Sequence, residues 1–164
     1  LSLHTTPERI RKANSFSMAP MIGVAILFIG IFITMIPALV LLKVHGTELG
    51  IDQPWQMFWV CGLLSSCLDN TPTYLVFLQT AASLGAAEGI ATTVGTVTPL
   101  MLEAISAGAV FMGAMTYIGN APNFMIKAIA EESGIKMPGF FAYIGWAIVI
   151  LCPVFIIDTL VFYM

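Results

Sequence analysis

The stretch Ser65-Ser66-Cys67-Leu68-Asp69-Asn70-Thr71-Pro72-Thr73 interrupts a long apolar segment with polar residues and a proline. A second interruption follows later in the chain and reads Thr116-Tyr117-Ile118-Gly119-Asn120-Ala121-Pro122-Asn123. In the hydrocarbon core of a membrane every backbone polar group must be hydrogen-bonded within the protein. A broken helix therefore persists there only where it packs against protein or lines a water-filled cavity. Paired broken helices indicate the ion or substrate site of a secondary transporter. These two stretches decide the fold that we predict.

The composition of the chain is that of a membrane protein. Hydrophobic residues make up 59% of the 164 residues and charged residues only 9%, whereas a soluble domain carries about 25% charged residues. The sequence therefore predicts an integral membrane protein whose main partner is the lipid bilayer. The six basic residues are dispersed along the chain, which excludes a nucleic-acid-binding surface.

The spacing of charges predicts the transmembrane segments, because about 20 apolar residues cross the hydrocarbon. We predict a cytoplasmic loop over residues 1–17, transmembrane helices over 18–43 and 140–163, and an interrupted transmembrane helix over 103–131. Basic residues precede the first span and lie in the last loop, which places both on the cytoplasmic side. The fold class is all-α, with a multi-pass location in the inner membrane.

Residues 55–84 form two apolar arms around the first interruption. Each arm is only about 12–14 residues, or roughly 20 Å of helix, and is too short to span alone. Together the arms make either one long span or a re-entrant helical hairpin. We favour the hairpin, because Asp69-Asn70-Thr71-Pro72 is typical of a turn. Residues 85–102 are rich in Gly, Ala and Thr, and we interpret them as a connector that crosses the membrane or lies along its surface.

Asp69 is the strongest candidate for a functional residue, because 16 uncharged residues precede it and 18 follow it. An acid at the middle of a membrane costs about 2.5–3.5 kcal/mol on insertion scales, so it is rarely incidental. Its carboxyl group could exchange a proton for a cation. The structural alternative is that Asp69 caps the second arm. The candidate ion- or substrate-binding residues of this interruption are Ser66, Asp69, Asn70, Thr71 and Thr73.

Oxygen atoms near Asp69 would suit a hard cation such as Na⁺, by the logic that governs Ca²⁺ and Mg²⁺. Exposed amides at the start of the second arm could instead bind an anion. At the second interruption the candidates are Gly119, Asn120, Pro122 and Asn123. The alternative there is a proline kink with asparagine bonded back to the main chain. We predict a Na⁺ site at Asp69, Asn70 and Asn120.

Other polar residues carry less weight in the prediction. Glu103 lies at the edge of a span, and Asp158 lies near the outer interface or faces the helix bundle. The three cysteines form no CxxC pair, and we interpret them as small buried membrane residues. No nucleophile and base are arranged for catalysis, so we predict no enzyme and no cofactor beyond Na⁺ and H⁺ as transported or coupling ions.

Two stretches, Cys61–Thr73 and Ala114–Met125, resemble the C-terminal half of the ion-transporter superfamily. That superfamily includes citrate, arsenite and dicarboxylate permeases and D-type Na⁺/H⁺ antiporters. The likeness is closest to the citrate-transporter-like proteins often described as sodium:proton antiporters. The resemblance implies one repeat of an inverted-repeat transporter, with a missing N-terminal half as its partner, a homodimer and elevator-like alternating access. It also implies ligand contacts from the hairpin tip and the helix break.

The tip departs from the pattern of sodium-coupled dicarboxylate carriers, which typically have Ser-Asn-Thr there. Here it reads Asp69-Asn70-Thr71, and a carboxylate repels an anionic substrate but favours Na⁺ or H⁺. The sequence therefore favours Na⁺/H⁺ antiport. One alternative is an H⁺- or Na⁺-coupled citrate or dicarboxylate permease. Another, from a different class, is a non-transporting membrane scaffold subunit.

Overall fold

The structure is a computed structural model that describes residues 5–13 and 19–164, in two units that divide after Met35. The first unit holds α2 (Glu8–Ala13) and most of α3 (Ala19–His45). Parts of the predicted cytoplasmic loop 1–17, and residue 18 of the predicted first span, lie outside the described residues. Helix α3 has 27 residues, about 40 Å at 1.5 Å per residue, which is long enough to cross a membrane.

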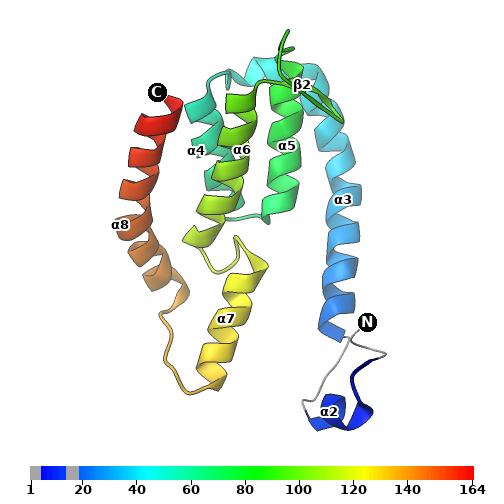
Figure 1. Ribbon diagram of the computed structural model, residues 1–164, viewed down its shortest axis with the longest axis vertical. Coiled ribbons are helices and arrows are strands. Elements are labelled where there is room, and N and C mark those ends of the chain that lie inside the picture. The colour runs from blue at the N-terminus through cyan, green and yellow to red at the C-terminus, as the bar shows by residue number, and fades with distance from the viewer. Residues whose placement is uncertain (1–4, 14–18) are drawn as a thin grey trace. The chain divides into compact units, whose positions relative to one another are not determined.

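The second unit, residues 36–164, contains both interruptions and a series of short helices (Figure 1). After the end of α3 its elements are η1 (Gly46–Leu49), α4 (Pro54–Ser65), α5 (Asn70–Ser83), β1 (Ile90–Thr92), β2 (Gly95–Val97), α6 (Pro99–Phe111), η2 (Met112–Met115), α7 (Ala121–Glu132), α8 (Phe140–Asp158) and the π-helical turn η3 (Thr159–Tyr163).

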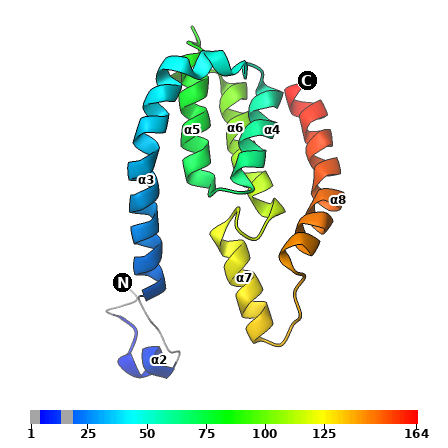
Figure 2. The same cartoon turned by 180° about the vertical axis from the view of Figure 1, so that it is seen from behind.

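Helices α4 and α5 form a helical hairpin around the first interruption, joined by a short turn, and α6 stands between the two arms in both views (Figures 1 and 2). Proline at position 54 starts α4, and the side chains of Gln53 and Gln56 complete a capping box there, which satisfies free amides of the first turn. Asp69 precedes α5 and accepts the Asn70 N–H. The chain turns back at this point instead of continuing as one helix. That both arms open to the same side of a membrane stays a prediction.

A small β-hairpin between α5 and α6 corrects the all-α prediction. Strands β1 and β2 pair antiparallel, with Thr92 opposite Gly95, in a run of β-branched residues that favours extended structure. The Thr92 hydroxyl donates to the Gly95 carbonyl at 2.6 Å and steadies the turn. The predicted connector 85–102 therefore contains regular secondary structure. It also ends early, because α6 starts at Pro99 and not at residue 103.

The core of the second unit lies where α4 crosses α6. Met57, Phe58 and Ile105 are fully buried there. The two backbones approach closely at Gly108, where a Cβ atom would lie 2.4 Å from the Phe58 carbonyl oxygen. Small residues at such crossings allow membrane helices to gain packing contacts.

We predict that Gly108→Ala destabilises the protein more than Gly62→Ala does. An added methyl at 108 meets the Phe58 main chain, whereas one at 62 meets the flexible end of Met112, 2.2 Å from its sulfur. Overpacking of this kind typically costs about 1–3 kcal/mol, and the Met112 side chain can move away from part of it. Thermal unfolding in detergent measures both variants. Equal melting temperatures would contradict the close backbone crossing.

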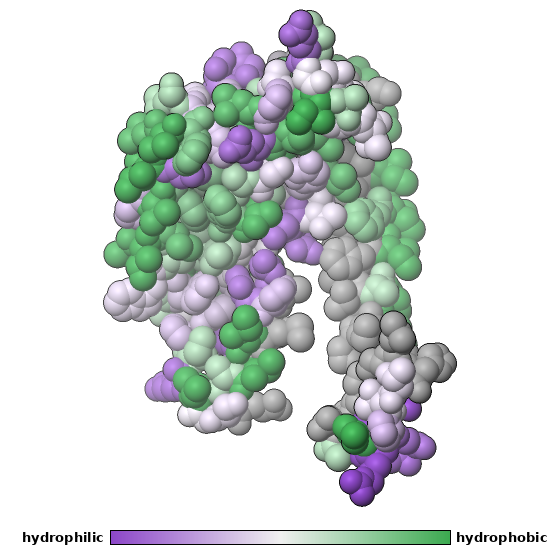
Figure 3. All heavy atoms as spheres, viewed as in Figure 1, coloured by the Kyte–Doolittle hydropathy of each residue, from purple (hydrophilic) through white to green (hydrophobic). Residues whose placement is uncertain are grey.

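Helix α8 and its π-helical end, Phe140–Tyr163, form a helix that is both long and apolar enough to cross a membrane. Most of its side chains are exposed, and Figure 3 shows hydrophobic residues over this side of the unit. It is anchored to α4, because Trp59 Nε1 donates to Thr159 Oγ1 at 2.9 Å and Phe155 packs edge-on against Phe58. The exposed apolar surface is the kind that lipid or a further protein segment covers.

Candidate ion and substrate site

The two interruptions, far apart in the sequence, lie against each other in the fold. The Thr116 hydroxyl donates to the Ser66 carbonyl at 2.5 Å. Gly119 packs on main chain, because a Cβ atom there would lie 2.7 Å from Ser66 O, 2.8 Å from Gly113 O and 2.9 Å from Ser65 O. Any side chain at this position would therefore push the two loops apart.

Asn70 links the hairpin tip to both sides of the second interruption. Its amide end lies 3.0 Å from the carbonyl oxygens of Ala109 and Gly119 and 2.9 Å from Ser65 Oγ. Carbonyl oxygens can only accept, and the single Ser65 hydroxyl proton is donated to Ala109 O at 2.6 Å. We therefore assign the amide nitrogen to this end, where it donates to these oxygens. The amide oxygen then points away from the carbonyls.

Ser65 and Thr116 belong to this junction and were not among the predicted site residues. Both side chains are buried. Besides its bond to Ser66, Thr116 Oγ1 accepts the N–H groups of Ile118 and Gly119 at 3.2 and 2.9 Å. Both residues stand inside the quoted polar stretches. A hydroxyl residue at the edge of an interrupted, uncharged helix is the signal that could have identified them, because broken helices need side-chain partners.

Three of the predicted ligand-binding residues donate hydrogen bonds to main-chain carbonyl groups. Asn123 Nδ2 donates to Thr116 O at 3.2 Å and more weakly to Gly113 O at 3.4 Å, and so bonds back to its own loop. Thr73 Oγ1 donates to Asp69 O at 3.0 Å, and Ser66 Oγ to Leu63 O at 2.7 Å. These side chains therefore help to hold the broken main chain in place, and their role as ligands stays a prediction.

Four helix ends meet at this junction, which determines its electrostatics. Helices α5 and α7 begin here, while α4 and η2 end here. Helix N-termini favour anions and C-terminal carbonyls favour cations. No three His, Cys, Asp or Glu side chains cluster anywhere within residues 5–13 and 19–164. A cation at the junction would therefore depend on carbonyls, neutral side chains and Asp69.

Two of the remaining candidates lie beside a cavity. Asn70 and the exposed Thr71 line a cavity of about 300 Å³ between α5 and α6, together with Tyr74 and Ser106. Asp69 and Asn120 do not line it. Asp69 is half-buried and accepts the Asn70 N–H at 2.9 Å, which is the capping role that we gave as its alternative.

Asn120 and Pro122 stand at the start of α7 on the other side of the junction. Asn120 is half-buried with an extended backbone (φ −152°), and its side chain does not cap α7. Pro122 is exposed in the first turn, where a proline costs no hydrogen bond. The structure thus brings Asn70 and Thr71 to one cavity, and a Na⁺ site shared by Asp69, Asn70 and Asn120 stays a prediction.

We predict that Asn70→Asp is more destabilising than Asn70→Ala, although Asp is nearly the same shape. An ionised carboxylate would face the acceptors Ala109 O and Gly119 O without a proton to donate. Alanine only removes the donor, and an unsatisfied buried group costs about 1–3 kcal/mol. Unfolding of both variants at pH 7.5 tests this order. If Asn70→Asp matched the wild type, the amide assignment would be wrong.

Comparison with known families identifies the group to which the chain belongs. A family profile described as "Putative citrate transport" matches residues 1–163. The comparison with curated proteins and the comparison with solved structures each gave no match. The match covers both interruptions and almost the whole chain. The protein therefore belongs to this citrate-transport family of membrane transporters.

Proposed function

We propose that the protein is the second repeat of a secondary transporter that carries citrate or a similar carboxylate across the inner membrane, coupled to H⁺ or Na⁺. The observation that carries this proposal is the junction of the two interruptions. There the N-termini of α5 and α7 meet the C-termini of α4 and η2, so anion-binding and cation-binding ends lie close together. The family match supports a carboxylate as the substrate.

Asp69 gives the coupling cation a role in this mechanism. A carboxylate at the hairpin tip repels citrate, so the anion binds well only when the charge of Asp69 is neutralised by H⁺ or Na⁺. Binding of the cation then raises the affinity for the substrate, which is the coupling that a symporter requires. Asn70 and Thr71 both line the adjoining cavity, and in this mechanism Thr71 and the oxygen of Asn70 contact the substrate or the cation from there.

Na⁺/H⁺ antiport is the second candidate, and the observation that favours it is the carboxyl group of Asp69 at the tip. An antiporter would use the same carboxyl for proton and cation in turn, with no organic substrate. The family match favours the carboxylate proposal over this one. The inverted N-terminal repeat, the homodimer and the elevator motion remain part of the proposal.

Transport by the full transporter in proteoliposomes separates the candidates. Labelled citrate should accumulate inside when an inward Na⁺ or H⁺ gradient is imposed, and it should not accumulate without one. In the antiport case, added Na⁺ moves protons, read with a pH dye, when no citrate is present. A non-transporting scaffold would give neither signal, and absence of citrate uptake from correctly inserted protein would rule out the carboxylate proposal.

The native Cys67 offers a direct binding assay at the hairpin tip once the half-buried Cys152 is replaced by serine, because Cys67 is exposed and Cys61 is buried. Citrate with Na⁺ should slow maleimide labelling of Cys67. A matched control is Ala87→Cys in a Cys67→Ser background, because Ala87 is exposed at the other end of the hairpin. Equal labelling of Cys67 with and without citrate and Na⁺ would place the substrate elsewhere.

A further inference from the structure

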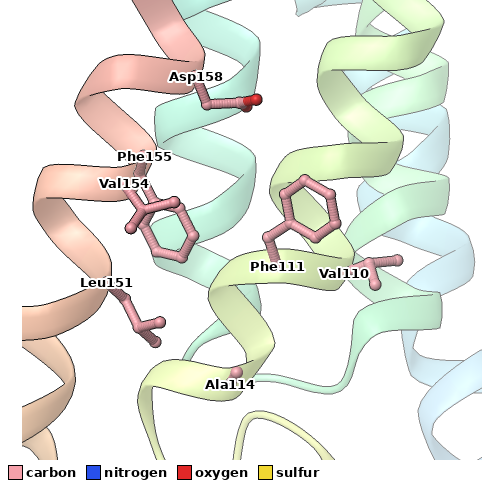
Figure 4. A pocket seen from close by; sticks show the side chains of 7 residues that line it. All are labelled: Val110, Phe111, Ala114, Leu151, Val154, Phe155 and Asp158. Carbon is pink, nitrogen blue, oxygen red and sulfur yellow. The ribbon is translucent and has the colours of Figure 1, made fainter.

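A second cavity, of about 400 Å³, lies between α6 and α8. The cavity beside Asn70 lies instead between α5 and α6. The α6–α8 cavity is lined almost wholly by carbon, including the rings of Phe111 and Phe155 and the side chain of Leu151 (Figure 4). The only charged residue in its lining is Asp158. Transport by the proposed mechanism uses none of these residues.

The Asp158 carboxylate extends from α8 across the gap toward α6, above the two phenyl rings (Figure 4). The residue is half-buried, and its Oδ2 atom is shielded from solvent and has no hydrogen-bond partner among the described residues. A carboxylate oxygen without donors in an apolar setting is unfavourable. A positively charged donor is therefore the partner that this oxygen atom favours.

The surroundings of Asp158 add negative charge and supply no positive charge. A neighbouring cavity of about 380 Å³ shares Asp158 and Phe111 and is also lined by Glu103. No basic side chain lines either cavity in the part of the chain that the structure describes. Lys127 is bound to Glu131, with 2.9 Å from Nζ to each carboxylate oxygen. The charge and the apolar lining together define the chemistry of a ligand.

We propose that the cavity between α6 and α8 binds an organic monocation, a protonated amine carried on an apolar body. The ammonium group donates to Asp158 Oδ2 in a charge-assisted hydrogen bond. The apolar body packs against Leu151, and the faces of Phe111 and Phe155 attract the cation as well. A bare metal ion fits poorly, because one carboxylate among carbon atoms supplies too few ligands. The site does not depend on the proposed transport of carboxylates.

Three probes of one shape test this site in purified protein reconstituted in nanodiscs of phosphatidylcholine, a lipid that has no primary amine. They are 4-phenylbutylammonium, neutral 4-phenylbutan-1-ol and anionic 4-phenylbutyrate. We expect the ammonium to bind about ten-fold more tightly than the alcohol in calorimetric titration, the difference of one charge-assisted hydrogen bond. The carboxylate should bind most weakly.

Variants assign the binding to Asp158. Asp158→Asn should bring the affinity for the ammonium down to that for the alcohol, while Glu103→Gln, the matched charge control, should retain the preference for the ammonium. Leu151→Trp fills the cavity and should weaken binding of all three probes. Equal affinities for ammonium and alcohol in the wild type, or a preference that survives Asp158→Asn, would overturn the proposal. If Asp158→Asn does not fold, the wild-type comparison and Leu151→Trp still decide it.

Discussion

Gly119→Ala is expected to abolish most transport, although it adds a single methyl group. The three atoms that the methyl would meet are the main-chain oxygens of Ser65, Ser66 and Gly113, at 2.7 to 2.9 Å. None of them is the end of a flexible side chain, so the loops themselves must separate. Overpacking typically costs about 1–3 kcal/mol. The separation would also break the bonds from Thr116 to Ser66 and from Asn70 to Gly119.

Citrate uptake and thermal unfolding measure the effect of Gly119→Ala. The matched control is Gly145→Ala in α8, where an added Cβ meets nothing within 4 Å and alanine is the better helix former. The control should keep full uptake and wild-type stability. Normal uptake by Gly119→Ala would show that the two interruptions do not need to touch during transport.

Asp69→Asn is expected to fold normally and to lose cation-coupled uptake. Asparagine caps a helix as well as aspartate does, so the role of Asp69 Oδ1 as acceptor for the Asn70 N–H is preserved. The charge that would attract H⁺ or Na⁺ is removed. Uptake driven by a Na⁺ or H⁺ gradient should therefore fall by at least about ten-fold, the effect of losing one strong ionic contact.

Two controls separate charge from capping at this position. Asp69→Ala removes both and should also lower the melting temperature, since loss of a cap costs about 0.5–2 kcal/mol. Asp52→Asn removes an equal charge from an exposed loop residue and should leave uptake unchanged. If Asp69→Asn kept gradient-driven uptake, Asp69 would be a cap and not the coupling residue. If the wild-type protein carries no citrate and Asp69→Asn loses the Na⁺-triggered proton flux, antiport would be the correct mechanism.

Features that depend only on residues close together in the sequence could be predicted from it. Low charge and long apolar runs identify a membrane protein, because the insertion of a segment depends on its own residues. The turn at Asp69-Asn70-Thr71-Pro72 indicates a break for the same local reason, and the chain does turn back there. The β-hairpin at residues 90–97 was missed, because its strands have only three residues each and give almost no periodic signal.

The site itself shows what a sequence pattern determines and what it leaves open. The sequence alone determined the membrane class, the family resemblance and the two polar interruptions that hold the site. Only the tertiary structure decided which of their residues lock the interruptions together, as Asn70, Thr116 and Gly119 do, and which stay open, as Thr71 does. It also decided that Asp158 faces a cavity between α6 and α8. The physical reason is that hydrogen bonds and close packing join residues by distance in space, and spacing along the chain does not determine which helix ends meet.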